Sequence, residues 1–166
     1  MTGQASGYRV LTSAQVALIT AIQDELVPRE GERPGAGEAE GAAAVDGYIH
    51  ARPVLQTNVL TVLEAVDAVA QSRAAKQPAD GGTSPFAALS AGDRVEVLRA
   101  AEADQPEPFR TLVELTYTAY YTNPAIQALL GPESQPPQPE GHPAPPPIDE
   151  RRVERVKQRG QLWRDA

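Results

Sequence analysis

Apolar side chains recur at every third or fourth position through most of the first 131 residues, and this period constrains the fold more than any other feature. The longest example lies in residues 54–75, where spacings of four and three residues join Leu55, Val59, Val62, Val66 and Val69. A period near 3.6 places such side chains on one face of a helix, and it outweighs the weaker helix propensity of valine. No internal repeat and no strand-like alternation accompanies it. The pattern therefore predicts an all-α fold.

Caps and helix breakers predict where the helices begin and end. Thr12 and Gln15 form the T-x-x-Q pattern of a capping box, and Ser90 forms a second cap. Asn123 is a third cap, followed by Pro124, which suits the first helical position because proline has no N–H to leave unpaired. These signals predict a small bundle of four to six helices, over residues 12–26, 42–49, 54–75, 91–103, 106–121 and 124–130.

The same periodicity predicts which side chains are buried. Two sets are expected in the core, Val95, Leu98 and Ala101 of one helix and Ile126, Leu129 and Leu130 of the last helix. By contrast, residues 29–44 are rich in Gly, Glu and Ala and contain too few large apolar groups to bury anything. We therefore expect a solvated loop between the first two helices.

The composition changes abruptly after Gly131. Residues 132–147 contain half of the 16 prolines and no large apolar residue, which predicts an extended, polyproline-like linker. Residues 148–166 then carry six basic and four acidic side chains. We therefore divide the chain into a helical domain over 1–131, a proline-rich linker over 132–150 and a partner-docking arm over 151–166.

The composition leaves little for catalysis within this chain. Cysteine is absent and only His50 and His142 are present, so thiol nucleophiles, thiolate metal sites and disulfides are excluded and a histidine metal site is disfavoured. The acidic residues of the Glu-rich loop and of one helix and its end are better interpreted as a solvated face than as an acid–base pair. They are Glu30, Glu32, Glu38, Glu40, Glu96, Glu102 and Asp104. No glycine pattern supports nucleotide binding. We expect no catalytic, metal or cofactor site in this chain.

The net charge and the N-terminal sequence indicate which classes of partner are unsuitable and in which compartment the protein is expected. The net charge of −7 argues against binding to nucleic acid or to a membrane surface. The first ten residues show no signal peptide and no twin arginine, and no apolar run reaches the roughly 20 residues needed to span a bilayer. A cytoplasmic protein without direct membrane insertion is expected.

Three of the five tyrosines lie within five residues at the end of one predicted helix. Tyr117 and Tyr121 share a face at helical spacing, while Tyr120 points about 60° away from Tyr117. Either the three rings pack in the core with their hydroxyls at its rim, or they form a partner-binding patch with the following Asn123 and Pro124. The residues alone leave both alternatives open.

The C-terminal arm contains the second candidate contact site. The lone Trp163 has no local core to join, so it either dangles or docks on this domain or on another protein. Tryptophan and arginine often anchor protein interfaces, which favours docking on protein. The candidate residues of the arm are Arg155, Arg159, Leu162, Trp163 and Arg164.

The order of several segments resembles the gluconate 2-dehydrogenase subunit 3 family over residues 10–131. The segments are LTSAQVALITAIQDELVPRE, VDGYI, PFAALSAGDRVEVLRAAE and PFRTLVELTYTAYYTNPAIQALLG, and the tail RVKQRGQLWR is similar to C-terminal arms of some members. The most specific pieces are Phe86 with Leu89-Ser90, and the turn Tyr120-Tyr121-Thr-Asn-Pro.

The resemblance implies an accessory role in a hetero-oligomer. Members are small subunits of flavin dehydrogenases that oxidise sugars, polyols or sugar acids. The large subunit, of the glucose–methanol–choline (GMC) oxidoreductase type, holds FAD and the catalytic groups, and a cytochrome c subunit is often the electron acceptor. The family has no catalytic residues to carry over. This chain departs from many members in lacking an export signal and cysteine.

The sequence thus predicts a non-catalytic small subunit that binds and stabilises an FAD-dependent oxidoreductase acting on a sugar, glycoside or polyol. The alternative is a free-standing helical adaptor or regulator that binds another protein. An enzyme in its own right is the weakest alternative, because no acid–base pair has a defensible geometry.

Overall fold

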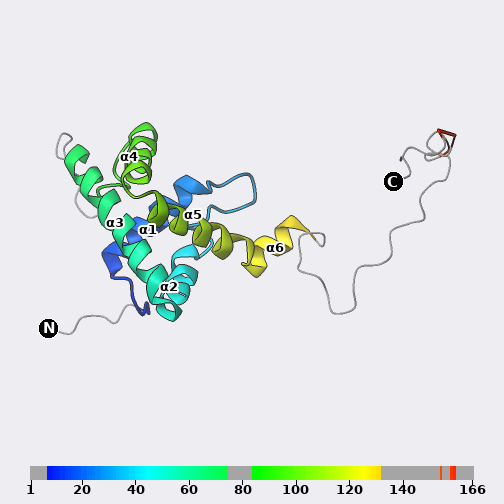
Figure 1. Ribbon diagram of the computed structural model, residues 1–166, viewed down its shortest axis with the longest axis horizontal. Coiled ribbons are helices and arrows are strands. Elements are labelled where there is room, and N and C mark those ends of the chain that lie inside the picture. The colour runs from blue at the N-terminus through cyan, green and yellow to red at the C-terminus, as the bar shows by residue number, and fades with distance from the viewer. Residues whose placement is uncertain (1–6, 75–83, 132–153, 155–157, 160–166) are drawn as a thin grey trace, which may run out of the picture. The chain divides into compact units, whose positions relative to one another are not determined.

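The computed structural model describes residues 7–74, 84–131, 154 and 158–159 of the 166 in the chain. Within these residues the regular elements are helices, apart from one isolated antiparallel bridge between Glu30 and Arg33. The helices are α1 (Ser13–Leu26), α2 (Gly41–Ala51), α3 (Pro53–Ala74), α4 (Ala91–Asp104), α5 (Pro106–Tyr121) and α6 (Pro124–Leu130) (Figure 1). The prediction of an all-α fold with four to six helices is confirmed for the described residues.

The chain divides into two compact units, Met1–Ser134 and Gln135–Ala166. All six helices belong to the first unit. In the second, the described residues show one helical hydrogen bond, from Gln158 N to the Glu154 carbonyl at 3.0 Å. The proline-rich linker predicted over 132–150 lies outside the described residues, and the predicted domain boundaries stay a prediction.

The helices α3 and α5 form the centre of the first unit. They pack against each other, each also contacts α1, α2 and α4, and α6 packs on α5 (Figure 1). Burial of an apolar stripe against several neighbours supplies most of the stability of helices of this length. The fully buried side chains of the core include Ile19, Ile22, Val45, Ile49, Val59, Val62, Leu63, Val66, Phe86 and Leu112.

The predicted caps are present. The Thr12 hydroxyl accepts from Gln15 N at 3.3 Å while Gln15 Oε1 accepts from Thr12 N at 2.9 Å, which completes the capping box of α1. Ser90 caps α4 and Asn123 caps α6 through their side-chain oxygens. Gly131 ends α6 with a φ of +90°, a conformation that glycine adopts without strain.

Two predictions about the core are wrong. Val95 of α4 is exposed, and Val97 is buried beside Leu98 and Ala101 instead. The buried face of this short helix therefore contains Val97, Leu98 and Ala101, and Val95 lies outside it. In α6, Ile126 is buried, but Leu129 is 49% exposed, because α6 packs only its Ile126 side against α5.

The expectation that residues 29–44 bury nothing is also wrong. Ala36 is fully buried in a small cluster with Tyr120 and Ile126, and Ala42 belongs to the main core. Small residues are buried here because the chain passes close to α1 and to the end of α5, where larger side chains would not fit. The segment is thus an ordered part of the domain, and α2 already begins at Gly41.

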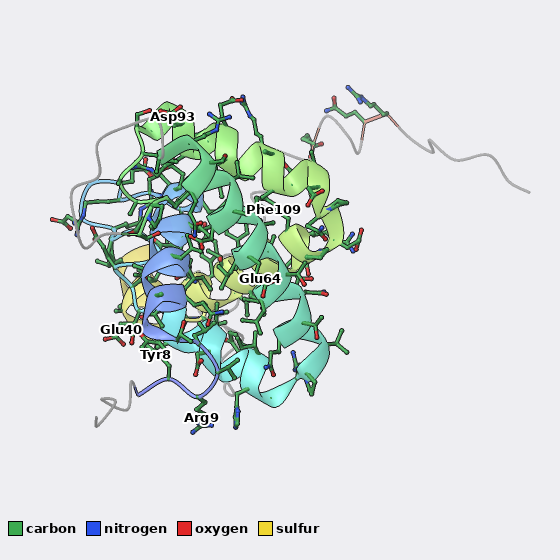
Figure 2. All side chains as sticks on the ribbon, turned by 90° about the vertical axis from the view of Figure 1, so that its left-hand side faces the viewer. Tyr8, Arg9, Glu40, Glu64, Asp93 and Phe109 are labelled. Atoms are coloured by element: carbon green, nitrogen blue, oxygen red, sulfur yellow. The ribbon has the colours of Figure 1, made fainter. Side chains whose placement is uncertain are left out.

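A buried carboxylate fixes the segment that leads into α1, where Figure 2 labels Tyr8 and Arg9. Asp46 of α2 is 4% exposed and accepts from the backbone N–H groups of Arg9 at 2.7 Å, Val10 at 3.0 Å and Leu11 at 2.8 Å. Burial by itself raises the pKa of Asp46, but these three hydrogen bonds, with a contribution from His50, together lower it by more, so the net pKa lies below the usual value. The carboxylate is therefore charged when the protein is folded at neutral pH.

Candidate functional site

The three clustered tyrosines occupy the last turns of α5 and have different exposures. Tyr117 and Tyr121 are 44% and 49% exposed, and their rings are stacked with centroids 6.2 Å apart and an interplanar angle of 24°. The ring of Tyr120 meets that of Tyr121 edge-on at 5.2 Å and is itself buried. The helix thus presents one pair of stacked aromatic rings to solvent.

Tyr120 is part of the domain interior. Its hydroxyl donates to the Pro34 carbonyl at 3.0 Å, and its ring packs in the cluster that contains Ala36 and Ile126. A buried tyrosine hydroxyl needs a hydrogen-bond partner, and the loop carbonyl supplies it. The structure therefore separates the three tyrosines into one internal residue and two surface residues, and a partner-binding role for any of them stays a prediction.

Asn123 and Pro124 lie at the turn between α5 and α6. Asn123 Oδ1 accepts from Ala125 N at 2.9 Å as the cap of α6, while its Nδ2 donates to the Ala39 carbonyl at 2.9 Å. Asn123 therefore holds the same loop as Tyr120 does. Pro124 occupies the first position of α6 and is exposed.

The surface tyrosines line a groove of about 330 Å³, which we call the tyrosine groove. One wall is formed by the three tyrosines and the other by the chain that leaves α1. The residues of that second wall are Leu26, Val27, Pro28, Arg29, Glu30 and Arg33. Arginine and glutamate at its rim are paired with each other, Arg29 with Glu38 and Arg33 with Glu30. The groove thus combines aromatic surface with a polar rim of balanced charge.

The loop that follows the second wall, residues 34–39, is hydrogen-bonded to side chains of α1, of α5 and of the turn before α6. Asp24 of α1 accepts from Gly37 N at 2.9 Å and from Glu38 N at 3.3 Å, in addition to the bonds from Tyr120 and Asn123. Ala36 N also donates to the Val27 carbonyl at 3.0 Å. A surface that is already ordered loses less entropy when it binds a partner.

Glycine is required where the loop passes over α1. A Cβ on Gly37 would lie 2.5 Å from the Thr20 carbonyl oxygen and 2.7 Å from Asp24 Oδ2. We expect Gly37→Ala to lower the free energy of unfolding by about 1–3 kcal/mol, because the backbone must shift and the Asp24 bonds weaken. The measurement is chemical denaturation monitored by circular dichroism.

The matched control for that substitution is Gly47→Ala. Gly47 lies inside α2, where an added Cβ meets nothing within 4 Å, so alanine should stabilise the helix by about 0.5–1 kcal/mol. Opposite signs for the two glycines are the expected result. Equal small effects would contradict the close packing of the loop.

The sequence interpretation missed the loop wall of the groove. The R-E-G-E-R run around Gly31 signals a tight turn between paired charges, and Gly31 does adopt a φ of +59°. The glycines at positions 35 and 37 are a second available signal, because residues without a side chain allow the chain to pass close to another segment. Neither signal identifies the tyrosines as the opposite wall.

The remaining predicted site residues lie in the C-terminal arm. Arg159 is described and exposed. Arg155, Leu162, Trp163 and Arg164 lie outside the described residues. Their docking role stays a prediction.

Several of the charged and ionisable side chains that the sequence analysis considered for catalysis are exposed in the described residues. His50 is exposed in the last turn of α2, and the carboxylates of Glu30, Glu38, Glu96 and Glu102 are exposed as predicted. Among the residues described, no group of three or more His, Asp and Glu side chains is arranged to hold a metal ion. None of the described helices is both long enough and apolar enough to cross a membrane.

The comparison with protein families gives one clear result. The model of the family described as gluconate 2-dehydrogenase subunit 3 matches residues 13–131. No curated protein and no solved structure gives a significant match to the chain. The matched range begins at the first residue of α1, ends at the C-cap of α6 and includes the whole tyrosine groove. Because the match covers well over half of the chain, this protein belongs to the gluconate 2-dehydrogenase subunit 3 family.

Proposed function

We propose that this chain is a non-catalytic small subunit that binds and stabilises an FAD-dependent oxidoreductase of the GMC type. The observation that carries the proposal is the family match over 13–131, because the family is named as one subunit of a dehydrogenase. In the proposed complex the large subunit holds FAD and oxidises a sugar, glycoside or polyol, and a cytochrome c is a candidate electron acceptor. The small subunit contributes contact surface.

The tyrosine groove is the surface that best supports this proposal. Tyr117 and Tyr121 present two large rings with few rotatable bonds, which bury much area on binding at a low entropy cost. The facing loop is already held by Asp24, Tyr120 and Asn123. A rigid aromatic pair beside an ordered wall has the anatomy of an interface centre.

The proposal is tested by the stability of the flavoprotein. We expect the large subunit to lose FAD and activity at a lower temperature when it is expressed alone than when it is co-expressed with this chain, because binding to the native state stabilises it. Flavin fluorescence during a thermal ramp measures the release. An unchanged release temperature would contradict a stabilising role.

Removal of residues 132–166 separates the arm from the helical domain. We expect the truncated chain to keep the helical circular dichroism and melting temperature of the full chain but to bind the flavoprotein more weakly, because the arm adds contact area, with Leu162 and Trp163 as its anchors. Pull-down with a tagged large subunit compares the two forms. Equal recovery of both would remove the arm from the binding mechanism.

A further inference from the structure

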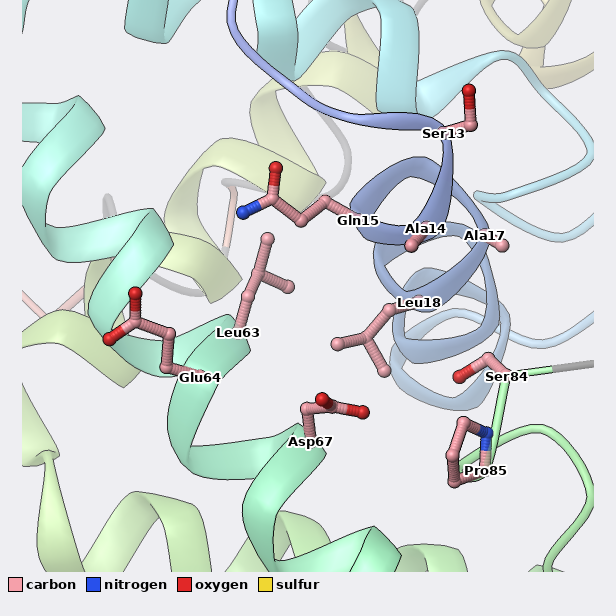
Figure 3. Close-up of a pocket in the computed structure, with 10 residues that line it drawn as sticks. All are labelled: Ser13, Ala14, Gln15, Ala17, Leu18, Leu63, Glu64, Asp67, Ser84 and Pro85. Atoms are coloured by element: carbon pink, nitrogen blue, oxygen red, sulfur yellow. The ribbon is translucent and has the colours of Figure 1, made fainter.

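Helix α1 carries two glutamines with opposite surroundings. Figure 3 shows Gln15 at a groove of about 510 Å³ between α1 and α3, and its Oε1 accepts from Thr12 N in the capping box. Gln23 lies about two turns later in α1 and is fully buried. Neither its Oε1 nor its Nε2 has a hydrogen-bond partner among the residues that the structure describes. A buried amide without partners is costly, so a further hydrogen-bonding group is expected beside Gln23.

The side-chain amide of Gln23 lies against the first residue of α2. A Cβ built on Gly41 would lie 2.8 Å from Gln23 Oε1 and 2.9 Å from Gln23 Nε2. The same point is 2.6 Å from the Ala36 carbonyl oxygen, which accepts from Gly41 N at 3.1 Å and keeps a second lone pair. Three polar atoms thus lie within 2.9 Å of one point. They are close enough for one water to bridge them, because two hydrogen bonds of ordinary length span up to about 5.6 Å.

The start of α2 adds a backbone donor to the same place. Glu40, the residue before the helix, has a φ of +59°, and its side chain makes no capping hydrogen bond. The N–H groups of Ala43 and Ala44 donate to the Glu40 carbonyl at 3.1 and 3.3 Å, and Gly41 N donates to the loop. Ala42 N forms no hydrogen bond within the described ranges, although Ala42 is only 3% exposed. First-turn N–H groups have no acceptor in their own helix, so a side chain, a water or a ligand must supply one.

We propose that one internal water molecule binds between Gln23 and the start of α2. The site offers two acceptors, Gln23 Oε1 and the Ala36 carbonyl oxygen, and two donors, Gln23 Nε2 and Ala42 N. An anion would meet the two oxygens and a cation the two N–H groups, whereas water both donates and accepts and typically makes about three hydrogen bonds in a buried site. The water joins α1 to the loop over 34–39 and to α2. The proposal does not depend on any partner protein.

The test measures magnetisation transfer from water in the full-length, ¹⁵N-labelled chain. We expect the backbone amide of Ala42 and the side-chain NH₂ of Gln23 to show dipolar cross-peaks with water of the sign typical of a bound molecule, which differs from the sign that hydrogen exchange gives in the rotating frame. Gln23→Met keeps the length of the side chain but removes both polar atoms, so the cross-peak at Ala42 should be lost. Oxygen-17 relaxation dispersion should then report one long-lived water fewer than in the unmodified chain.

The matched control is Gln71→Met, which makes the same replacement at an exposed position of α3 and should keep both cross-peaks. The absence of water cross-peaks at Ala42 and Gln23 in the unmodified chain would overturn the proposal, and this measurement needs no variant to fold. A scalar coupling across a hydrogen bond from Gln23 Nε2 to the Ala36 carbonyl would also overturn it, because the amide would then be bound directly. So would cross-peaks that persist in Gln23→Met, or an equal loss in Gln71→Met.

Discussion

Asp46→Asn is expected to lower the free energy of unfolding by about 3 kcal/mol, measured by urea denaturation near neutral pH. The two carboxylate oxygens of Asp46 accept three backbone N–H groups, from Arg9, Val10 and Leu11. An asparagine keeps one oxygen and turns an NH₂ group toward the remaining donors, so at least one buried donor loses its partner. The segment before α1 should detach first, which hydrogen exchange at Leu11 would report.

The pH dependence follows from the lowered pKa of Asp46. Because the folded state holds this carboxyl at a lower pKa than the unfolded chain does, the folded state binds fewer protons as the carboxyl titrates. The contribution is therefore present in full above the unfolded value of about 3.9 and is lost as the pH falls through the lower folded value. We expect the difference in free energy of unfolding between Asp46→Asn and the parent chain to become smaller as the pH falls below the unfolded value.

The control for Asp46 is Glu102→Gln, which also replaces an acid by its amide. Glu102 is exposed on α4, so the change in stability should stay within about 0.5 kcal/mol. A loss of similar size in both variants would show that net charge, and not the three hydrogen bonds, determines the effect of Asp46.

Combined replacement of Tyr117 and Tyr121 by alanine is expected to weaken binding of the flavoprotein about 100-fold, measured by biolayer interferometry. Both rings are about half exposed and stacked, so they are accessible to a partner. Their loss removes the largest exposed aromatic surface of the tyrosine groove while Tyr120 keeps its bond to Pro34. The helical fold should persist, as circular dichroism will show.

Two controls separate aromatic contact from other effects. Replacing both tyrosines by phenylalanine keeps the rings and should change binding by less than about tenfold, because only the hydroxyls are lost. Val54→Ala removes another exposed apolar side chain, 74% exposed on α3, and should leave binding unchanged. If Val54→Ala weakens binding as much as the tyrosine pair does, the tyrosine groove is not the main contact.

The helices could be predicted because their signals are local. The box of Thr12 with Gln15, the cap at Asn123 and the period of 54–75 each act within a few residues, and the structure contains all three. The sequence left open whether the three tyrosines pack in the core or form a partner-binding patch, and the structure buries Tyr120 while exposing Tyr117 and Tyr121. Local signals could not choose between these alternatives, because burial at the end of α5 depends on where the loop lies.

The loop and the grooves depend on contacts between distant residues. Tyr120 and Pro34 are 86 positions apart, and Asp46 binds a segment 35 to 37 positions away. Small residues such as Ala36 carry no hydrophobic pattern, so their burial follows only from the close approach of the chain to α1 and α5. The burial of Val97 in place of Val95 also depends on distant contacts, because the neighbouring helices determine which side of a short helix is covered.

The central claim, that this chain binds an FAD-dependent large subunit through the tyrosine groove, is tested most directly by co-purification. The tagged chain is co-expressed with a candidate GMC-type flavoprotein, and the complex is resolved by size exclusion with flavin absorbance recorded across the profile. The account predicts that flavin elutes with the unmodified chain and separates from it when Tyr117 and Tyr121 are both alanine. Flavin that elutes apart from the unmodified chain, or that stays with the alanine variant undiminished, would contradict the account.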